Sequence, residues 1–193
     1  MILPPPPLSA HQLVVFLIDG TLRDQHWPAA AVDHVVAVAH RCLAASNHRF
    51  AWVVFDTTAT AVRRWADMVS GTSLADTVRR LPPGLTGEPA TLDAGLAAAY
   101  QLSLSFLDQH DDGLPATVDL LAVIGSGGDC QGAGHAEIAG DSRIQLAVAS
   151  FGRPGPGPAG LDLTVVDGPE LGPVWLAARQ RMAGRRRPHL VLG

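Results

Sequence analysis

The chain has 193 residues, of which 47% are hydrophobic, and a formal net charge of −4 at pH 7. A chain of this length and composition can bury one sizeable core, which indicates a single globular domain. The acidic balance argues against a general nucleic-acid binder, and no apolar run reaches the ~18 residues of a membrane-spanning helix. The two cysteines, Cys42 and Cys130, do not make a disulfide framework. We therefore expect neither a nucleic-acid partner nor a membrane partner.

The two ends of the chain differ in composition from the middle. Residues 1–12 are rich in proline and are expected to form a disordered tail. Residues 184–193 form a basic tail in which Arg185, Arg186 and Arg187 are interpreted as solvated charges, so the domain is expected at 13–183. The N-terminus lacks the basic segment of a secretory signal, which predicts a cytoplasmic protein. The bias towards Ala, Arg, Gly and Pro, with no lysine, is typical of a bacterium with a GC-rich genome.

The most informative stretch is the apolar run Leu13–Ile18, which leads directly into Asp19, Gly20 and Thr21. A run of this length, rich in β-branched residues and ended by Asp-Gly, predicts a buried parallel strand. The polar residues that follow then lie on the loop at the carboxyl end of the strand. In open α/β sheets this edge is where ligands bind, so the loop is a candidate site.

The rest of the chain alternates between helical and strand patterns. Hydrophobic spacing predicts further strands over 50–55, 59–65, 118–125, 144–151 and 161–166, and helices over 28–45, 73–81, 91–107 and 172–183. Residues 131–142 are predicted to be a loop or a weak helix. The strand at 59–65 carries Arg63 and Arg64, which would protect an edge. The fold class expected is therefore α/β: a doubly wound, mostly parallel central sheet with one antiparallel edge hairpin and helices on both faces.

Three loops together resemble those of von Willebrand factor A-like (vWA) domains. That family carries Asp-x-Ser-x-Ser after its first strand, where this chain has Asp19-Gly20-Thr21-Leu22-Arg23. A threonine that begins a helix stands at Thr91, and Ser126 follows the 118–125 strand at the position where the family has an aspartate. The resemblance extends over about 13–183 and includes a turn similar to the family's Phe-Ser-Asp-x-Ala at 55–59.

The resemblance implies a metal-ion-dependent adhesion site in which Asp19, Thr21 and Thr91 supply oxygen ligands. Mg²⁺ prefers such oxygen octahedra. Arg23 and Ser126 depart from the family pattern, which makes the site a degenerate one. Two like unit charges about 4 Å apart repel each other by about 4 kcal/mol at an effective dielectric near 20, and the repulsion between Arg23 and a divalent ion would be twice as large. We therefore expect no cofactor, or a weakly bound Mg²⁺; alternatively, Arg23 pairs with Asp19 in place of the ion.

Members of the vWA family act as interaction modules, which implies a non-catalytic adaptor for another protein. The residues expected to bind that partner are Asp19, Thr21, Arg23, Thr91 and Ser126. Family members often work beside AAA+ ATPases, proteases or defence components, so the resemblance implies a role in a bacterial multi-protein system.

Two enzymatic alternatives rest on single features. A cysteine hydrolase could use Cys130 with His135, since the glycine-rich loop between them could offer backbone donors to an oxyanion. A phosphatase remnant of the haloacid dehalogenase class would match Asp-Gly-Thr at Asp19. That class needs a nucleophilic aspartate where this chain has Leu17, and a lysine, which the chain lacks.

Overall fold

The computed structural model describes residues 11–20, 48–55, 59–66, 91–124, 133–151 and 163–166. These segments form six strands and two helices. The strands are β1 (His11–Asp19), β2 (His48–Phe55), β3 (Ala59–Ala66), β4 (Ala116–Ile124), β5 (Ile144–Phe151) and β6 (Leu163–Val166). The helices are α3 (Leu92–Gln109) and α4 (Ala133–Gly140).

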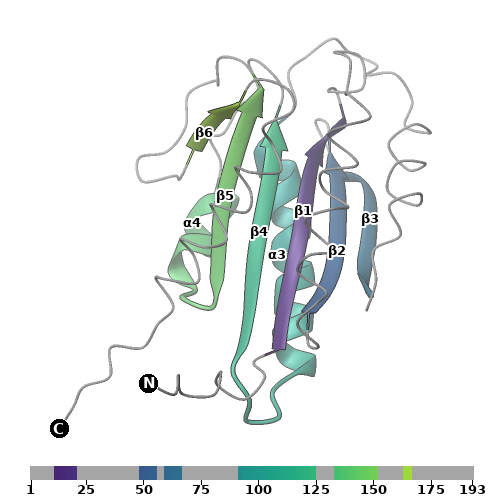
Figure 1. Ribbon diagram of the computed structural model, residues 1–193, viewed down its shortest axis with the longest axis vertical. Helices are drawn as coiled ribbons and strands as arrows, with labels where there is room; N and C mark the ends of the chain where they lie inside the picture. The colour runs from purple at the N-terminus through teal and green to yellow at the C-terminus, as the bar shows by residue number, and fades with distance from the viewer. Residues whose placement is uncertain are drawn as a thin grey trace, which may run out of the picture.

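The described strands form one sheet in the order β3-β2-β1-β4-β5-β6 (Figure 1). β1 is parallel to both of its neighbours, β2 and β4, and the parallel arrangement continues through β5 to β6. β3 pairs with β2 in the antiparallel direction. The chain moves outward from β1 to one side through β2 and β3, and then returns to the other side with β4. The strand order therefore reverses between β1 and β4, which in open α/β sheets marks the place where a crevice opens at the carboxyl ends.

Side chains of β1 are buried on both faces of the sheet. Leu13, Val15 and Leu17 belong to the core that packs against α3, and the intervening Val14, Phe16 and Ile18 are also fully buried. A parallel strand that is buried on both faces of the sheet has an unbroken apolar sequence, because neither face is exposed to water. This explains why the run Leu13–Ile18 predicted the strand correctly.

The helix α3 lies along one face of the sheet and runs opposite to the parallel strands (Figure 1). Its buried residues recur three and four positions apart, as a helix with one face on a core requires: Leu92, Gly95, Leu96, Ala99, Leu102, Ser103, Phe106 and Leu107. The buried Ser103 hydroxyl donates a hydrogen bond to the carbonyl of Ala99 at 2.7 Å, so this polar group has a partner within the core. The shorter α4 adds Ile138 to the same core.

The predicted mostly parallel α/β sheet is confirmed, and α3, β4 and β5 lie within two residues of their expected bounds. α4 is a regular helix inside the stretch 131–142. The expected helices at 28–45, 73–81 and 172–183, and the basic tail, lie outside the described residues. Neither described helix is long and apolar enough to cross a membrane.

One boundary differs from the expectation. β1 begins at His11, although residues 1–12 were expected to be a tail. Both added residues are tied to the rest of the sheet by their side chains. The Gln12 amide donates to the carboxylate of Asp119 at 2.6 Å, and the imidazole of His11 donates to Asp112 at 2.9 Å. Such partners, far away in the sequence, are invisible to a reading of local composition.

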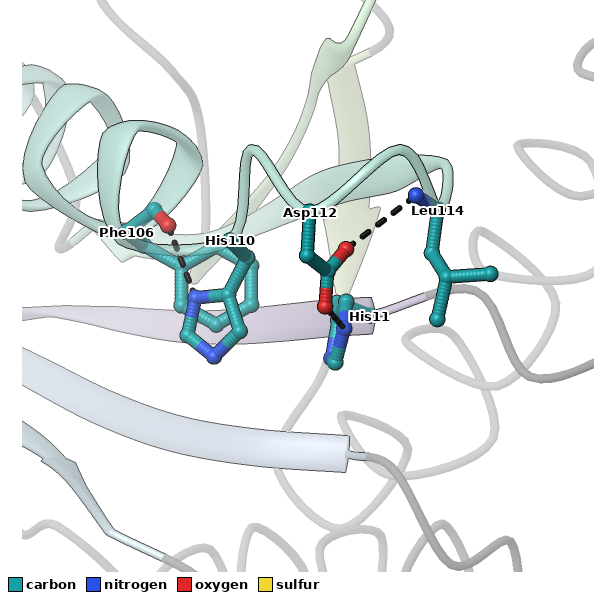
Figure 2. A network of polar contacts seen from close by, with 5 residues as sticks. All are labelled: His11, Phe106, His110, Asp112 and Leu114. Carbon is teal, nitrogen blue, oxygen red and sulfur yellow. Dashed lines mark hydrogen bonds and ion pairs between the residues drawn. The ribbon is translucent and has the colours of Figure 1, made fainter.

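Figure 2 shows how His11 is held where α3 ends and the connection to β4 begins. The rings of His11 and His110 have centroids 4.5 Å apart. Nδ1 of His110 donates to the Phe106 carbonyl at 2.8 Å, which accounts for one of the carbonyls left open at the helix end. Asp112 also accepts the backbone N–H of Leu114 at 3.1 Å. This cluster joins the start of β1 to the end of α3.

We expect Gln12→Leu to destabilise the protein by about 1–3 kcal/mol, because the carboxylate of Asp119 is 2% exposed and would lose a hydrogen-bond donor. Urea unfolding measures the change. The control is Gln101→Leu, on the exposed side of α3, which should stay within about 0.5 kcal/mol of wild type. Equal stability of the two variants would show that the Gln12–Asp119 bond contributes nothing.

The His11–Asp112 contact should make stability depend on pH. Its hydrogen bond, with that of the Leu114 N–H, lowers the pKa of Asp112. A lowered folded-state pKa stabilises the fold above the unfolded value of about 3.9, and this contribution is lost as pH falls through the folded value. We therefore expect the stability difference between wild type and Asp112→Asn to be larger at about pH 5 than at about pH 2.5. Thermal unfolding at both pH values tests this, with the exposed Asp108→Asn as control; a difference independent of pH would contradict it.

Candidate functional site

Asp19 is the last residue of β1 and lies at the carboxyl edge of the sheet, where the strand order reverses. Its side chain is 0% exposed. Because side chains alternate along a strand, Asp19 lies on the same face as Val15 and Leu17, which is the face that α3 covers. Its register partner on β2 is Phe55, a member of the same core. A buried carboxylate thus lies on the α3 side of the sheet, at the edge that the sequence indicated.

Thr91 is the N-cap residue of α3 and so stands at the start of this helix, where the resemblance implied a threonine. Its backbone is extended, with φ −103° and ψ 110°, and its hydroxyl makes no capping hydrogen bond. Threonine at an N-cap usually accepts a hydrogen bond from the first turn of the helix. Here the hydroxyl is not used in that way, and the half-buried residue stands at the positive end of an 18-residue helix.

The two ends of α3 fix the side of the sheet on which Thr91 lies. At its C-terminal end, the ring of His110 contacts His11 at the amino edge of the sheet. At its N-terminal end, Gly95 lies against the ring of Phe55 at the carboxyl edge. Since Phe55 is the register partner of Asp19, the structure brings Thr91 and Asp19 to the same edge and the same face. These residues are far apart in the sequence, and their common location is the main structural result for the site.

The other residues predicted for the site are not placed by the structure. Thr21, Arg23 and Ser126 lie outside the described residues, as does Cys130. His135 lies in α4 and therefore in a helix rather than a glycine-rich loop, but its side chain is not described. The roles assigned to these residues remain predictions.

The described residues supply part of a ligand set for a hard cation. Asp19 offers a carboxylate and Thr91 a hydroxyl, whereas Mg²⁺ requires near-octahedral oxygen coordination that it completes with waters and one or two carboxylates. Within the part of the chain that the structure describes, no three His, Cys, Asp or Glu side chains gather closely enough to hold a metal ion. The cluster of His11, His110 and Asp112 at the opposite edge is therefore not a metal site either. The described donors alone therefore do not define a metal centre.

In a phosphatase of the haloacid dehalogenase class, the nucleophile would stand at the position of Leu17, which the structure describes. Leu17 is 0% exposed and packs in the core beneath α3. An apolar side chain in this place has no atom that could attack phosphorus. The edge at β1 thus has an oxygen-bearing residue at Asp19 but no catalytic group at Leu17.

Two contacts at the ends of α3 could not be predicted with certainty from local patterns. One is the contact between Gly95 and Phe55, and the other is the cluster of His11, His110 and Asp112. A glycine within a strongly helical pattern was the available signal for the first, because a glycine inside a helix can have a packing reason. No local signal existed for the second, since His11 and Asp112 are 101 residues apart.

Sequence comparison matches the chain neither to a protein-family model nor to a curated protein. Comparison of structures finds clear similarities. Proximal thread matrix protein 1 from the mussel byssus, in a structure "with zinc occupied MIDAS motif", has a TM-score of 0.60 and 10% identity over 91% of this chain. This chain spans 48% of that protein, about half its length.

Two further similar structures are vWA domains by description. The SpRpn10 VWA domain has a TM-score of 0.55 and 11% identity, covering 86% of this chain and 94% of its own. The von Willebrand factor type A structure from Catenulispora acidiphila has a TM-score of 0.57 and 16% identity, covering 91% of this chain and 42% of its own. At such identities the likeness concerns the fold. The chain therefore has a vWA-like fold.

Proposed function

We propose that this protein is a non-catalytic protein–protein interaction module of the vWA type, which binds a partner protein at the carboxyl edge of its sheet. The observation that carries the proposal is the buried carboxylate of Asp19, located at the strand-order reversal and on the face that α3 covers. The hydroxyl of Thr91, which makes no capping hydrogen bond, lies at the same edge. Thr21, Arg23 and Ser126 are the further residues that we propose for this surface, which is here called the docking edge.

The similar structures support this proposal through their fold. One of them holds zinc at a MIDAS motif, the kind of site that the pattern Asp19-Gly20-Thr21-Leu22-Arg23 resembles in degenerate form. We propose that docking in this chain does not depend on a metal ion, because Arg23 replaces a ligand with a positive charge. In this arrangement Arg23 pairs with Asp19, and a weakly bound Mg²⁺ is the alternative.

The wider setting rests on resemblance alone. We propose a cytoplasmic adaptor in a bacterial multi-protein system, with an AAA+ ATPase, a protease or a defence component as the partner. A fold specifies such partners poorly, because function resides in the surface residues that the fold presents. No contact in the described residues favours either of the enzymatic alternatives.

The docking edge can be tested by affinity capture from the source organism with the tagged full chain. We expect Thr91→Ala or Arg23→Ala to reduce retention of the main captured protein at least about tenfold, which corresponds to a loss of about 1.4 kcal/mol. Since the Thr91 hydroxyl makes no capping hydrogen bond, Thr91→Ala should leave the stability of the fold nearly unchanged.

The matched control for the capture experiment is Gln101→Ala, an exposed position in the middle of α3. Quantitative mass spectrometry of the captured proteins compares the variants. Retention of the same proteins at wild-type level by both edge variants would refute the docking edge, as would an equal loss in the control.

The role of Arg23 can be tested with Mg²⁺ alone. Arg23→Ser removes a cation from the neighbourhood of Asp19 and supplies a hydroxyl, so we expect the Mg²⁺ affinity to rise at least about tenfold. Isothermal titration with MgCl₂ measures it. Arg143→Ser, just before β5 and paired with Asp141 at 2.7 Å, is the control and should change nothing. Wild-type protein that binds Mg²⁺ as tightly as Arg23→Ser would contradict metal-independent docking.

A further inference from the structure

We propose that Gly95 is a positioning residue for the docking edge. Its missing side chain allows the first turns of α3 to lie directly on the Phe55 ring, and this contact sets the location of Thr91 relative to Asp19. The claim that Gly95 is needed for partner binding rests on the proposed function. The claim that Gly95 sets the location of Thr91 is independent of that function.

The contact leaves no room for a larger residue. A Cβ atom built on Gly95 would lie 2.6 Å from Cδ1 of Phe55, 2.9 Å from Cγ and 3.1 Å from Cε1. Real Cβ atoms essentially never lie within 3.0 Å of another heavy atom, as two of these distances would require, so either the ring or the helix would have to move. Phe55 is 0% exposed and belongs to the core beneath α3. Because protein cores are close-packed, the ring has little freedom, and the helix is the element that would shift.

Because Gly95 lies close to Thr91 in the helix, its contact with Phe55 affects where Thr91 lies. Gly95 lies four residues after Thr91, about one turn of helix and on nearly the same face. Phe55 is the register partner of Asp19 on the neighbouring strand. Asp19 and Phe55 are therefore fixed together by the sheet, while Thr91 is carried by the helix that rests on Phe55. A displacement of the first turns of α3 would move Thr91 and leave Asp19 in place.

The next turn of the helix shows that the close approach is local. Ala99 lies one turn beyond Gly95, is fully buried, and has the Cβ that Gly95 lacks. Glycine is also less favourable than alanine within a helix. The short distance between helix and sheet at the carboxyl edge explains why a glycine stands at position 95 in spite of its low helix propensity.

The geometric part can be tested without any partner, by comparing the amide chemical shifts of ¹⁵N-labelled variants with those of wild type. We expect Gly95→Ala to shift the amides of Thr91, Leu92 and Phe55. The matched control is Gly140→Ala at the end of α4, where an added Cβ would meet nothing within 4 Å, and it should leave those amides unchanged. Edge amides at wild-type positions in Gly95→Ala would overturn the inference.

A second variant covers the case in which Gly95→Ala does not fold. Phe55→Leu removes the far part of the ring instead of adding a methyl group, so it changes the same contact without crowding the core. We expect it to shift the amides of Thr91 and Leu92 as well. Unchanged amides at these two residues in Phe55→Leu would overturn the inference in the same way.

The capture experiment separates this inference from the proposed function. We expect Gly95→Ala to lower partner retention at least about tenfold, as Thr91→Ala does, while Gly140→Ala retains the partner. If Thr91→Ala loses the partner but folded Gly95→Ala keeps it, positioning by Gly95 is refuted and the docking edge stands. If the edge amides move but neither Gly95→Ala nor Thr91→Ala loses the partner, the docking function is refuted and the geometric role of Gly95 stands.

Discussion

The rest of the structure depends on the burial of β1 from Leu13 to Asp19. This strand has a parallel neighbour on each side, and its residues from Leu13 to Asp19 are 0% exposed. Backbone groups buried in this way need hydrogen-bond partners, and the two neighbouring strands supply them. Since β2 and β4 extend the sheet in opposite directions, β1 is also the strand at which the order reverses. The same constraint that makes β1 the centre of the core therefore places its last residue, Asp19, at the edge where α/β sheets bind their ligands.

The helix α3 connects this edge to the opposite one. Its end at His110 is fixed against His11, and its beginning rests on Phe55 through Gly95. A helix held at both ends has a defined position along its own axis, so the location of Thr91 follows from contacts at two sites rather than from the Thr91 side chain itself. Asp19 and Thr91 are thus positioned by a packed sheet and helix, which is the usual arrangement for residues that bind other molecules.

Local sequence patterns predicted the parts of the fold whose cause is local. The run Leu13–Ile18 indicated β1 because burial on both faces removes polar residues. The apolar spacing over 91–107 indicated α3 because one face of this helix packs on the core. The contact of Gly95 with Phe55 could not be predicted, since it depends on the distance between a helix and a strand. The bonds of His11 to Asp112 and of Gln12 to Asp119 span more than a hundred residues, and for that reason the start of β1 was expected too late. For the site, the resemblance implied that Asp19 and Thr91 share an edge, and the structure supports this.

The claim that the carboxyl edge of the sheet is the docking surface can be tested most directly by photo-crosslinking in the source organism. A photoreactive amino acid would replace Gly20, which directly follows Asp19, or Leu114, which is 41% exposed in the turn before β4 at the opposite edge. The account predicts a crosslinked partner protein from position 20 and none of the same protein from position 114. A partner that crosslinks from position 114 and not from position 20 would contradict it.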